Sequence, residues 1–333
     1  MPATAFSPRA WAAAFWLAAG LGGCNNAGES LGVTIQKTSA VSVLVYLDRD
    51  GSHTATSLDT VFAGARVALL IQGSQDTLRT ATSASTGIAR FDTVAVGQYT
   101  VAVVASSIGD SIEVAAIDST NVRITTADTN RGVVARLAYP EVTIRQARAL
   151  TLGRRVFVRG RILAGVQSFR DTTSHLADSS GQIRMTRVSL RGGLAGNNPG
   201  DSVSVLGVTS TRAGQRTLDL ALVSTFANRP EPVPFDVSTA AAATASGGVL
   251  DAALVRITGA LISDTATVSP DFVIHGSDGS GTLTIVIDPT LNLSRTLFKP
   301  GDHISTRGVL VPDGAGGWVL KPRSGGDISQ LGP

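Results

Sequence analysis

Two His/Asp pairs are the residues whose types and spacing are best suited to chemistry. His175 stands three residues before Asp178, and His275 stands three residues before Asp278. Such a pair can provide metal ligands or act in acid–base catalysis. A metal site needs at least three convergent ligands, and the neighbouring sequence offers no third one. We therefore interpret both Asp residues as turn residues, and we predict no catalytic residue, no cofactor and no enzymatic activity.

Asp48 and Asp50, which precede Gly51, are the second candidate for chemistry. Their carboxylates could supply oxygen ligands to Ca²⁺, but a calcium loop needs more ligands and ends in a carboxylate several positions later. Residues 52–54 provide no such group. Asp before Gly is also typical of a turn. We favour the turn, and a weak metal site at Asp48 and Asp50 stays the alternative.

Positive charge is concentrated between residues 141 and 226, a stretch that contains twelve Arg and five acidic residues. Some of these Arg alternate along predicted strands, so they could line one face and attract a polyanion. Single-strand binding also needs aromatic stacking platforms, and only Phe157, Phe169 and Phe226 are present; we assign the first and last of these to the core. A solvated basic face is the other interpretation. The candidate polyanion-binding residues are Arg154, Arg155, Arg159, Arg161, Arg170, Arg184 and Arg187.

Residues 1–24 have the features of an export signal. Arg9 precedes a twelve-residue apolar segment, 10–21, which is shorter than the roughly 20 residues that a membrane-spanning helix needs. The segment ends in Leu21-Gly22-Gly23-Cys24, and Cys24 is the single Cys of the chain. No disulfide can form within the chain, so its domains depend on core packing.

The tetrad that ends at Cys24 resembles the bacterial lipobox. This resemblance implies cleavage before Cys24 and lipid attachment to its thiol, which would give stable membrane attachment. We therefore predict an extracytoplasmic, lipid-anchored protein of the cell envelope, at the outer membrane or cell surface.

Short stretches of alternating apolar and polar residues follow, separated by Gly, Ser, Asp and Thr, and they predict a β-sandwich between residues 41 and 138. The strands are expected at 41–47, 65–71, 87–91, 98–104, 111–117 and 132–137. In the segment Gly97-Gln98-Tyr99-Thr100-Val101, Gly97 is expected to turn tightly. The Tyr99 ring is expected to be buried, with its hydroxyl bonded to the backbone.

The motifs at 45–51, 64–69, 87–91 and 94–101 resemble those of the prealbumin-type sandwiches found in carboxypeptidase-regulatory-like domains and in the B domains of serine–aspartate-repeat surface proteins. The resemblance covers about residues 41–104. It implies a spacer or adhesive module without a catalytic site.

The remainder of the chain contains two copies of one unit. Residues 156–163 correspond to 255–262, 175–181 to 275–281, and Pro199-Gly200-Asp201 to Pro300-Gly301-Asp302, so the offset stays between 99 and 101. Each copy is predicted to contain five strands, with an insert after the third. In the first copy these are about 154–163, 172–177, 182–189, 202–209 and 216–224.

Five strands with this insert are typical of an OB barrel. The pattern resembles the bacterial OB-fold domains of surface and secreted proteins, including those that accompany extracellular nucleases. The predicted fold is thus all-β, with an Ig/prealbumin-like sandwich followed by two OB-like five-stranded barrels. The predicted boundaries are 1–23 for the signal peptide, 24–40 for a tether, 41–138 for the sandwich, 141–226 for the first barrel, 227–234 for a linker and 235–328 for the second barrel.

These features favour a non-catalytic envelope lipoprotein that acts as a binding, adhesion or spacer module for a glycan, a polymer or a protein. The alternative is that the basic first barrel binds single-stranded nucleic acid or another polyanion, as an accessory to an extracellular nuclease. The formal net charge of +3 is too small to decide between them.

The lipid anchor has a direct test. Replacing Cys24 with Ala removes the only thiol that could carry the lipid. We expect the C24A protein to move from the membrane fraction to the soluble fraction after cell breakage. If C24A stays with the membranes as the unaltered protein does, the anchor is wrong.

Overall fold

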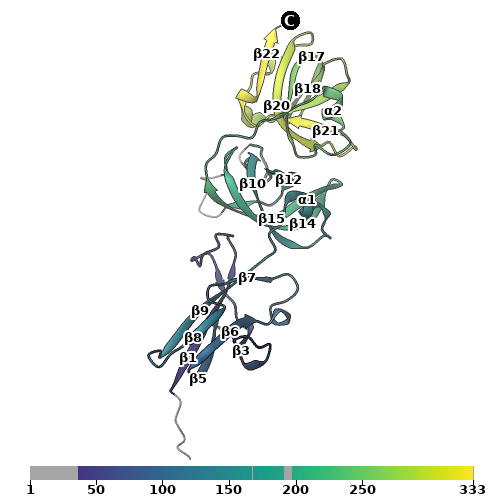
Figure 1. Cartoon of the computed structure of the whole chain (residues 1–333). Coiled ribbons are helices and arrows are strands. Elements are labelled where there is room, and N and C mark those ends of the chain that lie inside the picture. The colour runs from purple at the N-terminus through teal and green to yellow at the C-terminus, as the bar shows by residue number, and fades with distance from the viewer. Residues whose placement is uncertain (1–36, 167, 191–196, 333) are drawn as a thin grey trace, which may run out of the picture. The chain divides into compact units, whose positions relative to one another are not determined.

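The computed structural model describes residues 37–166, 168–190 and 197–332 (Figure 1). Cys24, the predicted signal peptide and most of the predicted tether lie outside the described residues. From Thr38 onward the chain forms a single contact unit. In the described part, no helix is long and apolar enough to cross a membrane.

Two β-sheets form the first domain, as predicted. One sheet has the order β2-β1-β9-β7, with β5 also paired to β1, and the other has the order β4-β3-β6-β8. The strand β1 pairs with β9 in parallel and with β5 in antiparallel orientation. The strand bounds are Thr38–Asp48 (β1), Thr60–Val61 (β2), Arg66–Ile71 (β3), Thr77–Thr82 (β4), Ile88–Ala95 (β5), Gly97–Val103 (β6), Glu113–Ile117 (β7), Asn121–Ile124 (β8) and Asn130–Ala138 (β9).

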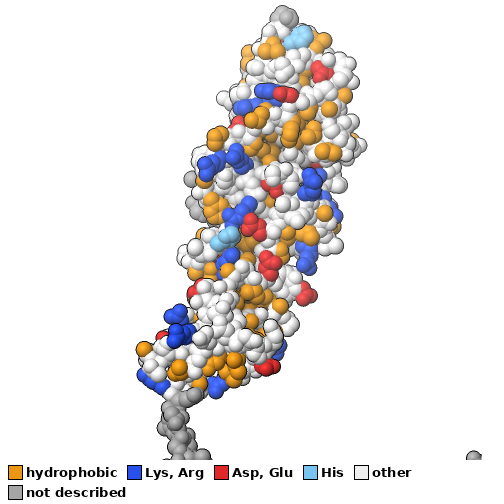
Figure 2. Space-filling view, in the orientation of Figure 1, with side chains coloured by type: hydrophobic (Ala, Val, Ile, Leu, Met, Phe, Trp, Pro, Cys, Tyr) orange, Lys and Arg blue, Asp and Glu red, His pale blue; other side chains and the backbone are white. Residues whose placement is uncertain are grey.

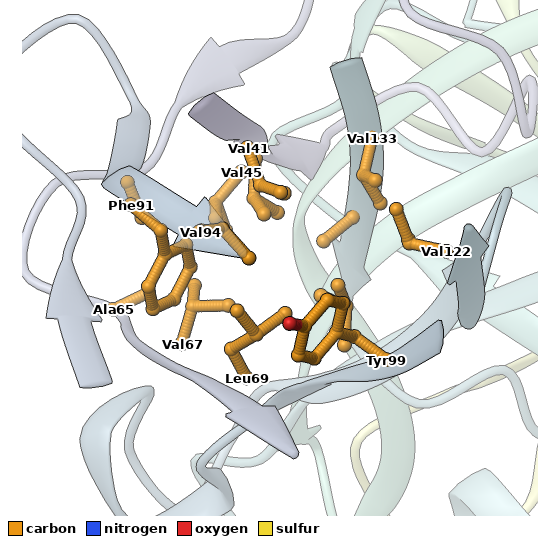
Figure 3. Packing of buried hydrophobic residues seen from close by; sticks show 14 of the residues in the cluster. Val41, Val45, Ala65, Val67, Leu69, Phe91, Val94, Tyr99, Val122 and Val133 are labelled. Atoms are coloured by element: carbon orange, nitrogen blue, oxygen red, sulfur yellow. The ribbon is translucent and has the colours of Figure 1, made fainter. Parts of the chain in front are cut away.

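A core of alternate aliphatic residues fills the space between these sheets (Figure 3). Val41 and Val45 of one sheet point toward Val67 and Leu69 of the other, and all four side chains are fully buried. The prediction for Tyr99 is confirmed, because its ring is buried and its hydroxyl donates to the Ala95 carbonyl at 2.8 Å.

The next six strands include the five of a closed barrel. Here β10 pairs with β11 and β14, β11 pairs with β12, and β14 pairs with β15. The ring closes where β12 and β15 run in parallel, with Arg184 opposite Thr217 and Met185 opposite Leu218. The bounds are Arg155–Ala164 (β10), Ser174–Asp178 (β11), Gly181–Met185 (β12), Ser189–Leu190 (β13), Ser202–Arg212 (β14) and Gln215–Ala227 (β15).

A second barrel repeats this topology, which confirms the two OB-like barrels (Figure 1). It closes through the parallel pair β19 and β21 and the antiparallel pair β17 and β20. The counterpart of β15 is divided into β21 and β22 around Pro322, a residue without a backbone donor. The bounds are Phe235–Asp236 (β16), Leu254–Val268 (β17), Asp271–Ser277 (β18), Thr282–Ile287 (β19), His303–Pro312 (β20), Trp318–Lys321 (β21) and Ile328–Gly332 (β22).

Each barrel is preceded by a short helix that the strand pattern did not predict. The bounds are Ile144–Ala149 (α1) and Thr239–Ala243 (α2). A capping box opens α1, because the Thr143 hydroxyl accepts from the Gln146 amide while the Gln146 side chain accepts from the Thr143 amide. This Thr-x-x-Gln spacing is a local signal for a helix start. In the described residues, 3-10 turns lie at Ala105–Ser107, Pro289–Leu291, Arg295–Leu297 and Gly325–Asp327.

The recurring Asp of the hairpin between the second and third strands caps this helix. In the first copy, Asp178 Oδ2 accepts from the Ile144 amide at 2.8 Å. In the second copy, Asp278 Oδ2 accepts from the Thr239 amide at 3.0 Å. The Ser two residues after each Asp accepts from the next helical amide. The repeated Asp-x-Ser-Gly segment therefore joins a hairpin tip to a helix 34 or 39 residues away in the chain.

The edges of the domains differ slightly from the prediction. The first strand begins at Thr38, inside the predicted tether, because Thr38 pairs with Ala95 and Ala40 with Asn130. The second barrel extends to Gly332, which pairs with His303. In both places the pairing partner is distant in the chain.

The helix cap can be tested through Asp278. Hydrogen bonds from the side chains of Ser280 and Thr239 lower its pKa in the folded state. We expect D278A to lose about 1 kcal/mol of unfolding free energy at pH 7, as for other lost caps. The folded pKa of Asp278 is lower than its unfolded pKa of about 3.9. Its contribution to stability is therefore fully present above the unfolded pKa and is lost as the pH falls from there through the folded pKa. Urea unfolding at pH 7 and pH 3 measures both effects.

The control for D278A is D264A, which removes an exposed carboxylate from β17 of the same barrel. Equal stability losses in D278A and D264A at pH 7 would contradict the capping role.

Candidate functional site

The outer face of β10 carries three of the seven candidate arginines. Val156 and Val158 are buried in the barrel core. Because side chains alternate along a strand, Arg155, Arg159 and Arg161 lie on the opposite, outer face. Another candidate, Arg154, directly precedes the strand. The strand thus supplies the alternating basic face that the sequence indicated.

Three of these arginines contact only uncharged groups. Arg154 donates to the Asp110 carbonyl at 3.4 Å, and Arg161 donates to the Pro230 carbonyl at 3.3 Å. Arg155 donates to the Tyr139 hydroxyl at 3.2 Å, and its guanidinium lies 5.4 Å from the centre of that ring. In the described chain, no carboxylate lies within 4.0 Å of these three guanidinium groups, so their charge is not neutralised by an ion pair.

Arg159 and Arg187 are paired with acids of their own region. Arg159 Nε lies 2.9 Å from Glu141 Oε1. Arg187 binds Asp219 through two nitrogens, and this hydrogen bonding lowers the pKa of Asp219. Arg187 is exposed and Arg159 is half-buried, and ion pairs near the surface contribute little to stability. A polyanion would have to replace Glu141 or Asp219 to bind them.

Arg170 and Arg184 occupy the surface that faces the second barrel. Arg170 lies 3.2 Å from Asp271 and 3.3 Å from Asp288, both in the second barrel. Arg184 is largely buried, and its nearest acid is Asp171 at 3.8 Å. The seven candidates therefore form no single patch, and Figure 2 likewise shows Lys and Arg side chains in separate groups on the visible face.

The aromatic residues of the first barrel differ partly from expectation. Phe157 is buried as predicted, but it lies on the outer face of β10, 6.4 Å from Tyr139. Phe226 was assigned to the core, and this was wrong: it is 47% exposed and lies under the Arg159 guanidinium at 5.3 Å. It is the penultimate residue of β15. Phe226 thus presents part of its ring beside a basic side chain.

In the described residues, no hydrogen bond or ion pair joins the His and the Asp of either pair. Asp178 and Asp278 cap helices, as described above. His175 is 1% exposed, and neither ring nitrogen has a hydrogen-bond partner in the described chain. Burial, with the nearby positive charges of Arg184, Lys321 and Arg323, lowers the pKa of His175 to about 3. Its ring is therefore neutral at physiological pH.

A loop of the sandwich brings three carboxylates together. Asp48, Asp50 and Asp59 each present an oxygen within 4.8 Å of the others, and this is the one such group of three or more His, Cys, Asp or Glu in residues 37–166, 168–190 and 197–332. Asp48 accepts from the Gly51 amide at 2.7 Å and from Arg136 at 3.0 Å. The bonds expected of a turn-forming Asp are present.

The spacing in this loop also fits a calcium site. Oxygen-bearing residues occupy positions 1, 3, 5, 7, 9 and 12 of the stretch 48–59, which are the ligand positions of a 12-residue EF-hand loop. The sixth residue, His53, adopts a positive φ of 67°, as the invariant Gly does there. The twelfth is Asp59 instead of Glu. Asp59 was not among the predicted ligands, because it lies eight residues beyond Gly51.

Burial by itself raises the pKa of Asp50, but hydrogen bonds from Ser52 and Thr56 outweigh it and leave the pKa lowered. The carboxylate is therefore ionised at neutral pH and available to a cation. Metal binding by this loop stays a prediction, now with Asp59 as an added ligand.

Comparison with known proteins assigns no family. No protein-family model matches the chain, and no curated protein matches it. Among solved structures, the chain is similar to a murine DNA-binding protein bound with double-stranded DNA (13% identity, TM-score 0.30), over 53% of this chain and 99% of that one.

Two further likenesses are shorter. One is to the S. pombe Stn1–ten1 complex (19% identity, TM-score 0.21), over 23% of this chain and 57% of that one. The other is to the asparaginyl-tRNA synthetase of Pyrococcus horikoshii (15% identity, TM-score 0.22), over 25% of this chain and only 20% of the synthetase chain. Likenesses this distant assign no activity to the chain.

The metal interpretation of the 48–59 loop has a direct test. A ligand that binds only the folded state stabilises it. We expect Ca²⁺ to raise the Tm of chelator-treated protein by several degrees, and D59N to abolish most of this rise. D92N, which removes an exposed carboxylate from the same domain, serves as the control and keeps the response. A Tm of the unaltered protein that is the same with Ca²⁺ and with chelator would show that these aspartates only shape the turn.

Proposed function

We propose that the first barrel binds an anionic polymer, with single-stranded nucleic acid as the ligand to test. The observation that carries this proposal is the set of Arg154, Arg155 and Arg161 at and along β10, which pair with no carboxylate of the described residues. Such guanidinium groups can bind phosphates without first losing an ion pair, so binding releases counterions at little internal cost.

The fold and the surface chemistry support this proposal. OB-type barrels bind oligonucleotides and oligosaccharides on their outer surfaces. The planar guanidinium group of Arg donates hydrogen bonds whose geometry matches that of a phosphate group. Phe226 adds one partly exposed aromatic ring beside Arg159, although this ring already contacts the guanidinium. With few stacking platforms, most of the affinity would be electrostatic and strongly dependent on salt.

The proposal assigns no catalytic step to the chain. Asp178 and Asp278 have structural partners, and His175 is buried and neutral. A lipid at Cys24 would hold the barrels outside the cytoplasm at the cell envelope. There the chain could concentrate a polymeric substrate for a separate nuclease.

A second candidate function is that of a surface spacer or adhesion module. It is favoured by the contacts that join the sandwich to the first barrel, where Arg159 donates to the Gly51 carbonyl at 2.7 Å and Arg154 to the Asp110 carbonyl. Contacts of this kind hold neighbouring domains together. Complete lack of polyanion binding at low salt would leave this candidate as the function.

The binding proposal predicts a specific salt dependence. In R154Q/R155Q/R161Q, the slope of log affinity for oligo(dT) against log salt should fall by about 2, because each lost phosphate contact contributes about 0.7 for single strands. Fluorescence anisotropy measures this slope between roughly 20 and 200 mM salt, the range in which phosphate contacts dominate binding.

The matched control is R66Q/R123Q/R131Q, which removes the same charge from exposed positions of the sandwich. It should leave the slope nearly unchanged. Equal losses in both triple variants would show only a general effect of net charge, and would contradict a specific site on β10.

A further inference from the structure

The surface of the first barrel formed by β11 and β12 carries a second group of basic and aromatic residues. In OB-type barrels the second and third strands, together with the loop that precedes them, form the usual ligand-binding face. Here that region presents His175 on β11, Arg184 on β12, and Phe169 and Arg170 in the loop before β11. His175 and Arg184 are cross-strand neighbours, and the Phe169 ring meets the His175 ring edge-on at 6.0 Å.

The second barrel covers this face. Leu254 and Val309 of the second barrel pack in one cluster with Leu163, Ala164 and Phe169 of the first. In addition, Lys321 Nζ lies 5.0 Å from the centre of the Phe169 ring, and Arg323 donates to the Leu163 carbonyl at 2.6 Å. The apolar part of the contact is this one small cluster, with Ala177 and Val311 packed against it.

Acidic residues of the second barrel pair with the arginines of this region. Asp271 and Asp288 both bind Arg170, as described above. Asp251 lies 3.5 Å from Arg148 of α1, and its charge also acts on Arg184. These three carboxylates therefore contact or face cations that would otherwise be free to bind phosphates.

The polar groups under this cover are incompletely satisfied. Both ring nitrogens of His175, Arg184 Nε and Thr217 Oγ1 are buried and have no hydrogen-bond partner in the described chain. Thr217 lies beside Arg184, where β12 and β15 pair. Buried polar groups without partners cost free energy, and a permanent interface normally pairs them or replaces them with apolar residues. Beneath the second barrel, this face instead keeps polar and cationic side chains that the contact does not pair fully.

From this we infer that the face made by Arg170, His175 and Arg184 is a second contact surface for the anionic polymer, and that Asp271 and Asp288 of the second barrel occupy it in the polymer's absence. The inference rests on the proposed function. A polymer phosphate would displace the two carboxylates from Arg170, and the barrels would separate at the Phe169 cluster.

The test weakens the intramolecular contact without removing any cation. In D271N/D288N, Arg170 loses both acidic partners, while an Asn at 288 can still accept from the Thr290 amide, as Asp288 does. We expect this full-length variant to bind oligo(dT) about five-fold more tightly than the unaltered protein at low salt, at the lower end of typical coupling between sites. The single variant D271N should show a smaller gain, and it serves if the double variant is unstable.

Two matched variants separate this effect from others. R170Q breaks the same two ion pairs but also removes the cation, so it should show no gain. D236N/D264N makes the same change in net charge at exposed positions of the second barrel that pair with no residue of the first, and it should also show no gain.

Equal affinities of D271N/D288N and the unaltered protein would overturn the inference and leave the proposed function intact. An equal gain in D236N/D264N would overturn it as well, because net charge would then explain the effect. If neither the unaltered protein nor any variant binds at low salt, the proposed function itself fails.

Discussion

Closure of each barrel depends on a parallel pairing between its third and fifth strands that involves only two residues of each strand. In the first barrel Arg184 and Met185 lie opposite Thr217 and Leu218, and the second barrel has the equivalent pairing of β19 with β21. Without it, two strand edges would expose unpaired backbone groups to other chains. The helix before each barrel packs near this closure, and the hairpin Asp fixes the start of that helix. The repeated motif thus supports the barrel.

The arginines of the first barrel differ in their partners, and those without an acidic partner are the ones proposed to bind a ligand. Arg154, Arg155 and Arg161 have no acidic partner within the described residues, whereas Arg159 and Arg187 each form an ion pair. Arg170 and Arg184 lie at the contact with the second barrel. In the described residues, β10 therefore carries arginines without acidic partners, while the neighbouring face contacts acidic residues of the second barrel. Composition gives the number of basic residues, but the partners decide which of them are available.

Local patterns in the sequence determined most of the architecture. Alternating aliphatic residues predicted the sandwich and ten barrel strands, because burial on one face of a strand requires period two. The repeat predicted two similar barrels, and Gly-x-Tyr predicted a buried Tyr99 with a backbone partner. The Thr-x-x-Gln capping box and the regular spacing of oxygen-bearing residues in 48–59 are further local signals in the sequence.

Contacts between distant residues were decided only by the tertiary structure. The sequence contains the Asp of each hairpin but does not reveal that it caps a helix more than 30 residues away. The repeated Gly also differs between the copies: a side chain at Gly160 would collide with the Ala177 carbonyl, while Gly259 is needed for its positive φ. Likewise, a count of arginines does not show which have acidic partners, since Asp271 and Asp288 lie about a hundred residues from Arg170. Burial and charge pairing across such separations arise only once the chain has folded.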